Sequence, residues 1–297
     1  MYLSCVVLGL RVWGFRFRGL PVLSCWGAGR IAGGEGVVEV SLDLGLSVSS
    51  VRVEGGVAFL PNGVGVEVGV LREFAGRCDG SVCVVEDGGV RLLEEWSPEE
   101  ETYYKLRCVV EGSAPTLQIN GVYMHRVLGM TPWDDSRRKV RVLGVRPRDR
   151  VLDVCTGLGY TAIHALRRGA RVTSIEKSET VLRFAEYNPW SRELGKVTVI
   201  HGDAFEVIGE FGDCSFDRVL HDPPRFGLAG ELYSQDFYRE LFRVLKPGGS
   251  LFHYVGSPGQ LIRGKDLAKG VAARLGSVGF VASVVRKEKC VLAFKPR

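Results

Sequence analysis

From Asp149 to the end of the chain, short apolar runs alternate with segments that repeat apolar residues at helical spacing. Strands are expected at 150–155, 171–176, 197–202, 217–222 and 250–256, and helices at 160–169, 178–188, 234–249 and 264–279. Apolar strands joined by short polar loops are typical of a parallel sheet with helices on both faces. The last two runs, 280–288 and 290–297, predict a hairpin that adds one antiparallel strand.

The first 95 residues have a different pattern, in which valine and glycine dominate. Alternating runs at 37–44, 50–71 and 81–95 predict strands, and Gly-Gly and Asn-Gly pairs predict turns between them. No helical period stands out, and no acid pair, histidine or serine–histidine set points to chemistry. We therefore expect a small β-rich module whose role the sequence leaves open.

Capping and turn residues predict the next two elements. Ser97 fits an N-cap, Pro98 the first helical turn and Glu100 the return arm of a capping box, so a helix is expected over about 98–110. An Asn-Gly pair in the middle of Thr116–His125 predicts a β-hairpin.

The change of pattern along the chain predicts three regions. These are a β-rich N-terminal module at 1–95, a connecting helix, hairpin and basic segment at 96–145, and the alternating domain at 146–297. The stretch Arg137–Arg150 carries seven basic residues in fourteen. Such a run can guide phosphate groups, although a charge run is more often a solvated face.

Composition narrows the class of protein. The chain has 297 residues, 45% hydrophobic and 25% charged, and a net charge of +5 that is compatible with a nucleic-acid partner. Its eight cysteines form no C-x-x-C pair and have no histidine at zinc spacing, so no metal site is expected. We expect reduced, buried thiols in a cytoplasmic protein, with a Cys78–Cys83 disulfide as the alternative.

The N-terminal twenty residues have some features of a signal peptide. Arg11 interrupts their apolar run, and the run is shorter than the ~20 apolar residues that a membrane span needs. We expect strand-forming sequence here, or an extension upstream of the native start that could include residues 1–33, and no membrane association. The oligomeric state stays open.

A glycine loop follows the first strand of the alternating domain. Asp153 ends that strand, and Gly157 and Gly159 lead into a helix whose free N–H groups can face a ligand. Glu176 ends the next strand 19 residues after Gly157, where doubly wound folds bind the ribose of an adenosine ligand. Asp203 ends the third strand, where a side chain can reach the adenine.

The loop alone allows three interpretations. Residues 157–162 fit the dinucleotide fingerprint G-x-G-x-x-A, and a glycine turn that only shapes a strand–helix join is also possible. The negative charge of Asp153 would repel a pyrophosphate and attract the ammonium group of an amino-acid cofactor. The charge therefore favours a cofactor with an amino-acid part.

Five motifs in order resemble those of class I S-adenosylmethionine-dependent methyltransferases. They are D-x-x-x-G-x-G at Asp153, the acid Glu176, "GDA" at Asp203, "DPP" at Asp222 and "VLKPGG" at 244–249. The resemblance covers about 146–297 and implies a Rossmann-like seven-stranded sheet that binds S-adenosylmethionine. The cofactor residues that it implies are Asp153, Cys155, Thr156, Gly157, Gly159, Tyr160, Glu176, Lys177, Asp203 and Ala204. "APTLQINGVYMHR", "VCTGLGYTA" and "DPPR" further resemble a family of predicted archaeal methyltransferases, from about residue 100.

The Asp-Pro-Pro loop implies the acceptor. In the methyltransferases that this chain resembles, such a loop follows the fourth strand and recognises a planar exocyclic amine. Asp222 and the carbonyl of Pro223 would accept its two N–H bonds, and Pro224 would keep the loop stiff. The family pattern continues with an aromatic residue, whereas this chain has Arg225; either its guanidinium plane or the ring of Phe226 would stack on the base.

The sequence therefore predicts methyl transfer to an exocyclic amino nitrogen of an RNA base, cytosine N4 or similar, with ribosomal RNA or tRNA as partner. Alternatives on the same fold are an aminopropyltransferase and a methyltransferase for a protein or small molecule. A nicotinamide-dependent oxidoreductase and a non-catalytic RNA-binding module also remain open. His221 is expected to be a core residue at a strand end, with a catalytic role as the alternative.

Overall fold

The computed structural model describes residues 9–77, 79–256, 261–262 and 265–297. The chain divides into two compact units. One, here called the sheet unit, contains the residues up to Phe15 together with Ser136–Glu179 and Leu194–Arg297. The other, here called the N-terminal unit, contains Arg16–Asp135 and Thr180–Glu193.

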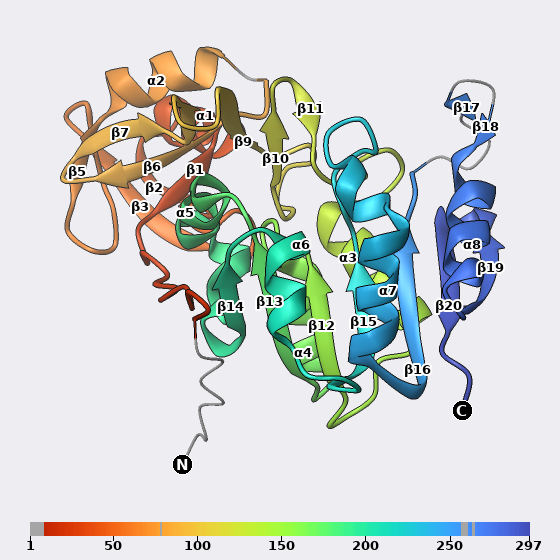
Figure 1. Cartoon of the computed structure of the whole chain (residues 1–297). Helices are drawn as coiled ribbons and strands as arrows, with labels where there is room; N and C mark the ends of the chain where they lie inside the picture. Colours follow the sequence, from red (N-terminus) through yellow and green to blue (C-terminus); the bar gives the residue numbers. More distant parts are fainter. Residues whose placement is uncertain (1–8, 78, 257–260, 263–264) are drawn as a thin grey trace. The chain divides into compact units, whose positions relative to one another are not determined.

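A seven-stranded sheet with the order β14-β13-β12-β15-β16-β20-β19 forms the centre of the sheet unit (Figure 1). Its strands are β12 Arg150–Val154, β13 Arg171–Glu176, β14 Thr198–His201, β15 Phe216–His221, β16 Leu245–Tyr254, β19 Val281–Val285 and β20 Cys290–Phe294. Neighbouring strands from β14 to β16 are parallel, and β20 is antiparallel to both β16 and β19. The Rossmann-like sheet with one antiparallel strand is therefore confirmed.

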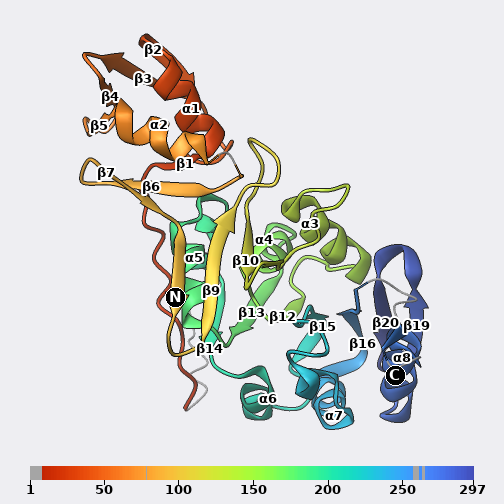
Figure 2. The same ribbon diagram turned by 90° about the horizontal axis from the view of Figure 1, so that it is seen from above.

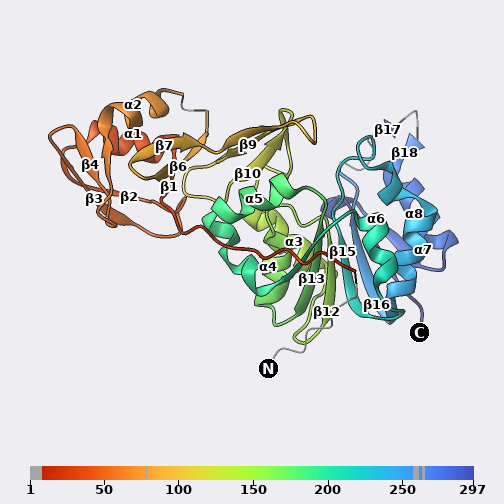
Figure 3. The same cartoon turned by 60° about the vertical axis from the view of Figure 1, so that its left-hand side comes forward.

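Helices cover both faces of this sheet. The helices are α3 Pro132–Leu143, α4 Tyr160–Arg167, α6 Ala204–Val207, α7 Gln235–Val244 and α8 Leu267–Ser277. Short 3-10 turns lie at Pro189–Lys196, Ile208–Glu210, Gly230–Tyr233 and Arg286–Glu288, and β17 Leu261–Ile262 pairs with β18 Lys265–Asp266. In Figures 2 and 3, α6, α7 and α8 lie on one face, and α4 and the end of α3 lie on the other.

The helix expected at 234–249 is shorter than predicted. It ends at Val244, and the following "LKPGG" begins β16 instead of forming a turn before it. The pairing of β15 with β16 shifts register between Phe216 and Arg218, where Gly248 adopts a φ of 77°. A bulge of this kind absorbs extra residues without breaking the ladder.

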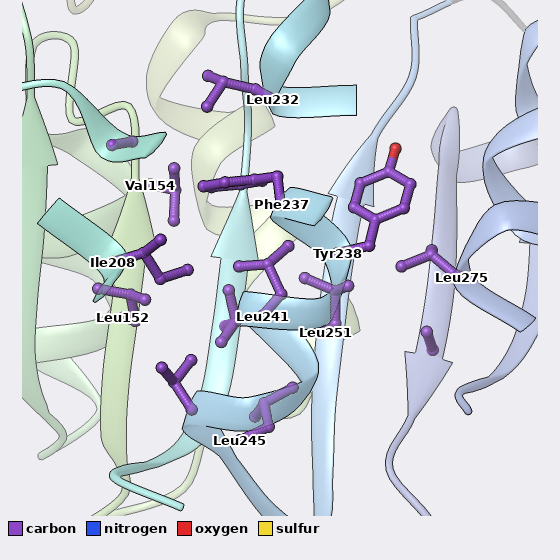
Figure 4. Close-up of a cluster of buried hydrophobic side chains, with 14 of the residues drawn as sticks. Leu152, Val154, Ile208, Leu232, Phe237, Tyr238, Leu241, Leu245, Leu251 and Leu275 are labelled. Atoms are coloured by element: carbon purple, nitrogen blue, oxygen red, sulfur yellow. The ribbon is translucent and has the colours of Figure 1, made fainter. Parts of the chain in front are cut away.

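The core on the α7 face fixes the position of the strand ends. Leu152 and Leu251 from the sheet, Phe237 and Leu241 from α7 and Leu275 from α8 pack together with exposed fractions of 0–1% (Figure 4). Each such side chain contributes about 1.5–3 kcal/mol to folding when fully buried. Strands held this firmly give the loops at their carboxyl ends a rigid base.

In its described residues the N-terminal unit has three small sheets, two helices of its own N-terminal segment and, apart from Glu179, the helix α5 Glu179–Tyr187. Its strands are β1 Val22–Ser24, β2 Gly36–Val40, β3 Ser49–Glu54, β4 Val57–Phe59, β5 Gly65–Glu67, β6 Val82–Glu86, β7 Gly89–Leu92, β8 Glu94–Ser97, β9 Thr102–Arg107, β10 Thr116–Ile119 and β11 Val122–Tyr123. The sheets have the orders β1-β6-β7, β2-β3-β4-β5 and β11-β10-β9-β8. Helices α1, Cys25–Gly33, and α2, Val68–Gly76, pack on a shared core with Leu23, Val51 and Val85.

Two predictions in this unit were wrong and one is confirmed. The sequence suggested no helix before residue 95, yet α1 and α2 are present, and α2 includes residues read as strand. The connecting helix expected over 98–110 is the strand β9, which pairs with β8 and β10. The hairpin of β10 and β11 is confirmed.

The segment around Val12 lies along β14 in the sheet unit. The N–H of Trp13 donates to the carbonyl of Val199 at 2.8 Å, and the N–H of His201 donates to that of Arg11 at 2.9 Å. The segment forms an isolated bridge that covers the edge of the sheet, and its described residues before Val22 belong to no strand. Among the residues that the structure describes, no helix has the length and apolarity to cross a lipid bilayer.

Candidate functional site

The predicted motifs meet at the carboxyl edge of the parallel strands. Val154, at the end of β12, pairs with Ile175 of β13 and with His221 of β15. Glu176 ends β13 and pairs with His201, which ends β14. The glycine loop, the acid after β13 and the Asp-Pro-Pro loop therefore leave the sheet as neighbours, where open α/β sheets bind ligands.

The glycine loop is built on left-handed backbone. Cys155, Gly157 and Gly159 have φ values of 69°, 55° and 79°. A Cβ added to Gly159 would lie 2.7 Å from a methyl carbon of Leu194, so only glycine fits there without a shift. Tyr160 then begins α4 and is 1% exposed, which anchors the helix end that follows the loop.

Replacing Gly159 with alanine should lower the free energy of unfolding by at least about 1 kcal/mol, because the residue is strained at positive φ and its Cβ meets Leu194. Urea unfolding measures the change. Gly209→Ala is the matched control, since a Cβ there has nothing within 4 Å. Equal losses in the two variants would contradict the tight packing of the loop.

Asp153 is a buried carboxylate with one unpartnered oxygen. Only 1% of Asp153 is exposed, and the hydroxyl of Ser174 donates to its Oδ2 at 2.7 Å. Oδ1 has no hydrogen-bond partner among the described residues. Burial raises the pKa of Asp153 to about 7. Because an unpartnered buried oxygen is costly, the site fits a ligand that brings a donor, and an ammonium group fits best.

Glu176 is tied to the glycine loop. The N–H of Gly157 donates to Oε2 at 2.8 Å and that of Ser178 to Oε1 at 3.0 Å. The hydroxyl of Thr156 lies 2.6 Å from that of Ser174 and so joins the loop to β13. A carboxylate offers about four acceptor positions, so Glu176 can hold its own loop and still accept from two hydroxyl groups.

Asp203 caps α6 and pairs with a lysine. Its Oδ1 accepts from the N–H of Phe205 at 2.9 Å, and its Oδ2 lies 2.7 Å from Nζ of Lys177. Ala204 follows as a buried residue, whereas Phe205 is 42% exposed and stacks on Phe237 with ring centroids 6.1 Å apart. The sequence analysis missed Phe205, although an aromatic residue two positions after a predicted adenine contact was a usable signal.

The charges of four carboxylates act on Cys155. Burial, and after it the charges of Glu176, Asp222, Asp153 and Asp203, raise the pKa of Cys155 well above its usual value. A thiol in such a setting stays protonated and is a poor nucleophile. Cys155 therefore fits a packing role.

The Asp-Pro-Pro loop begins directly after β15. The N–H of Asp222 donates to the carbonyl of Val154 at 3.3 Å, which joins the loop to β12. Pro223 is buried and Pro224 is exposed, and the hydroxyl of Tyr233 donates to the carbonyl of Pro224 at 2.9 Å. Thus the loop is held from both sides.

The two candidates for stacking differ in their surroundings. Arg225 is exposed. Phe226 is partly buried against the core and meets the ring of Tyr233 edge-on, with centroids 5.4 Å apart.

Lys139 is a site residue that the sequence analysis missed as such. It lies in α3, and its Nζ is 2.6 Å from Oδ2 of Asp222 and 4.4 Å from the ring centroid of Tyr254. Only 5% of Lys139 is exposed. Its place in a basic run suggested a phosphate contact, and 83 residues separate it from Asp222, so the pairing had no sequence signal.

The rest of the basic run contains one partly buried ion pair and five exposed arginines. Arg138 forms two hydrogen bonds with Glu288, one of them 2.7 Å long. The side chains of Arg137, Arg141, Arg146, Arg148 and Arg150 are exposed. The exposed arginines keep the phosphate-binding prediction open.

His221 is enclosed in the core. It is 0% exposed, its Nε2 lies 3.0 Å from the carbonyl of Leu232, and its ring centroid is 4.3 Å from that of His253. Burial lowers the pKa of His221 to about 4. This environment agrees with the core interpretation, because a neutral, enclosed imidazole has no path to a substrate proton.

The cysteines and metal ligands add no further site. Among the described residues no group of three or more histidine, cysteine or acidic side chains could hold a metal ion. Cys83 is a buried thiol whose pKa burial raises to about 12, and Cys78, its expected alternative partner, lies outside the described residues.

Comparison with known proteins assigns the family. A family model described as a methyltransferase domain matches residues 151–249. An uncharacterised protein of the archaeon Methanocaldococcus jannaschii is 49% identical over 245 residues, which cover 81% of this chain and 82% of that protein. The chain belongs to the class I S-adenosylmethionine-dependent methyltransferases. Its cofactor is S-adenosylmethionine.

More distant relatives agree with this family. Two proteins of the same archaeon, named as candidate ribosomal RNA large subunit methyltransferases, are each 38% identical over 86 residues. The match covers 28% of this methyltransferase and 22%, about a fifth, of each relative. The solved structure of a spermidine synthase bound to the transition-state analogue AdoDATO is similar to this one, with a TM-score of 0.53 and 14% sequence identity. The match covers 71% of this chain and 77% of the spermidine synthase chain. At that identity the likeness concerns the fold alone.

Proposed function

We propose that this methyltransferase transfers a methyl group to an exocyclic amino nitrogen of an RNA base, cytosine N4 or a similar amine. One observation carries the proposal. Asp222 follows β15 directly, is joined to β12 by its N–H, and therefore leaves the sheet beside the strand end that carries Asp153. An acceptor for amino N–H groups therefore lies beside the residues that fit the cofactor.

The cofactor roles follow from the chemistry of each acid. When bound, S-adenosylmethionine supplies an electrophilic methyl group on a sulfonium centre. The unpartnered Oδ1 of Asp153 would accept from the ammonium group, Glu176 from the ribose hydroxyls and Asp203 from the adenine amine. The remaining members of the proposed binding set line the same loops; they are Cys155, Thr156, Gly157, Gly159, Tyr160, Lys177 and Ala204.

Cofactor binding should depend on pH through Asp153. An ammonium group binds the ionised carboxylate, so below the pKa of about 7 the affinity should fall about tenfold per pH unit. Calorimetry with S-adenosylhomocysteine from pH 5.5 to 7.5 measures this slope. The Asp153→Asn variant should bind weakly at every pH with a flat profile. A wild-type affinity that is constant over this range would show that Asp153 does not meet the ammonium group.

Asp222 and the carbonyl of Pro223 would accept the two N–H bonds of the substrate amine. These bonds draw the nitrogen toward tetrahedral geometry and aim its lone pair at the methyl carbon. The bound cofactor would supply the methyl group and would be left as a neutral thioether, and the nitrogen held by Asp222 would then release one proton to water. Pro224 keeps the loop stiff, and the exposed guanidinium of Arg225 can stack on the base, since the ring of Phe226 already packs on Tyr233.

RNA as the substrate is supported by charge and by relatives. The relatives named as candidate ribosomal RNA methyltransferases match part of the chain. Exposed arginines between Arg137 and Arg150 can neutralise phosphates. We assign RNA docking to the β-rich module, residues 1–95. The connecting region, residues 96–145, joins this module to the catalytic domain, residues 146–297.

Transfer of tritium from methyl-labelled cofactor to separate RNA, protein and small-molecule fractions tests the proposal. Label is expected in ribosomal RNA or tRNA. Label only in protein or small molecules would contradict RNA as substrate, and a product heavier by an aminopropyl group would show the other transfer reaction. Tight binding of NAD without binding of S-adenosylhomocysteine would overturn the assignment of the site.

A further inference from the structure

A buried cation is built into the acceptor side of the site. The ammonium of Lys139 lies 2.6 Å from Oδ2 of Asp222 and over the ring of Tyr254 at 4.4 Å. The side chain of Lys139 is 6% exposed and that of Asp222 is 21% exposed. A lysine ammonium this enclosed cannot swing into water, so its charge remains beside the carboxylate.

This cation treats charged and neutral amines differently. An aliphatic amine has a pKa near 10 and enters a site as ammonium at neutral pH. At hydrogen-bond distance from Asp222 it would also lie close to Nζ of Lys139, in surroundings where water screens little. The charge of Asp222 is already compensated, so the two cations would repel each other.

An aryl amine brings no such charge. Its lone pair is delocalised into the ring, so it is neutral and offers two N–H donors. A carboxylate has about four acceptor positions, so Asp222 can bond Lys139 and an amino group together. The ion pair therefore leaves hydrogen bonding to a neutral amine intact while it removes the attraction for a cationic one.

We propose that Lys139 is a specificity-determining residue that restricts the acceptor to uncharged amino groups, such as those of nucleobases, and rejects aliphatic ammonium groups. This inference rests on the proposed function, because it takes Asp222 as the partner of the amine. Selection by Lys139 would allow methyl transfer to a nucleobase amine and would exclude reactions on polyamines or lysine side chains, whose nitrogens are cationic.

Calorimetry on the full-length protein saturated with S-adenosylhomocysteine tests this proposal. The probes are 1,3-diaminopropane, which is cationic, and cytidine, which is neutral. Lys139→Met should bind the diamine at least about tenfold more tightly than wild type, since the variant lacks the cation that compensates the charge of Asp222 and repels the diamine. The affinity for cytidine should change less than about threefold.

Lys246→Met is the matched control. Lys246 also lies 2.7 Å from an aspartate, Asp217, which is near the start of β15 and therefore at the opposite edge of the sheet. This variant should bind both probes as wild type does. Lys139→Gln serves if the methionine variant does not fold. Equal diamine affinities in wild type and in the Lys139 variants, including no binding in any of them, would overturn the proposal, as would a wild type that prefers the diamine.

The two proposals fail in different ways. If the acceptor is not RNA, the tritium assay finds no label in RNA while the charge preference at Lys139 persists. If Lys139 does not select the acceptor, RNA is labelled and the diamine affinity is the same with and without Lys139.

Discussion

Replacing Asp222 with alanine should lower kcat at least about a hundredfold, while the affinity for S-adenosylhomocysteine changes less than about threefold. The loss is expected because the carboxylate aligns the amine, and loss of one well-placed group that stabilises a transition state typically costs that much. Cofactor binding should persist because the bonds of the glycine loop to Glu176 do not involve Asp222. Single-turnover kinetics and calorimetry measure the two effects.

The alanine variant also leaves the buried Lys139 without its carboxylate, which would itself destabilise the protein. The double variant Asp222→Ala/Lys139→Met removes both charges and isolates the catalytic loss from this structural one. If the double variant regained turnover close to wild type, Asp222 would have a structural role in place of the proposed catalytic one.

The wild-type protein should lose about 2 kcal/mol more stability than a His221→Asn variant when the pH falls from 7.5 to 5. Burial lowers the pKa of His221 to about 4 from 6.5, so below pH 6.5 the unfolded chain binds more protons than the folded one. The stability that the neutral histidine contributes at high pH is therefore lost as the pH falls toward 4. Burial lowers the pKa of His253 also, so it acts with the same sign.

Asp153 titrates in the opposite sense. Burial raises its pKa to about 7, so the folded state binds the proton first and gains stability on acidification, by about 2–3 kcal/mol. The wild-type curve alone is therefore not diagnostic, whereas the difference between variants is. Urea unfolding at pH 7.5 and pH 5 measures the free energy of unfolding of each variant and so gives this difference. Tyr233→Phe is a control that keeps both histidines. The same pH dependence in wild type and in His221→Asn would contradict a neutral, buried His221.

The sheet unit was largely predictable because its local signals agree with one another. Apolar strands, a glycine at the end of a helix and a final hairpin all indicate the same fold, and each was found close to its expected position. The main error was at Pro247-Gly248-Gly249. These residues are typical of a turn, but pairing with β15 draws them into a bulged strand.

The N-terminal unit was harder because packing outweighs local preference there. Helix α1 contains glycines at 27, 29 and 33, which are weak helix formers, yet it packs on α2 and buries Ile31 and Ala28. The capping residues after Ser97 indicated a helix, but β9 lies between two partner strands, and its Tyr104 and Leu106 alternate onto the buried face of that sheet.

The candidate site also contains residues that the sequence could predict and residues that it could not. Residues within a motif, such as Gly157 and Asp222, could be found because their chemistry depends on local spacing. Lys139 could not, because its partner lies 83 residues away and meets it only when helix α3 and the loop after β15 come together in the folded chain. A charged residue in a basic run also gives no sign that it is buried. Contacts of this kind need the fold.

Nucleoside mass spectrometry after reaction with a deuterated-methyl cofactor tests the central claim most directly. RNA from a strain that lacks the gene is incubated with wild-type protein or with Asp222→Ala, digested and analysed. The account predicts one nucleoside that gains a trideuteromethyl group on its exocyclic nitrogen with wild type and not with the variant. A label on a ring carbon or ribose oxygen, or the same label with the variant, would contradict it.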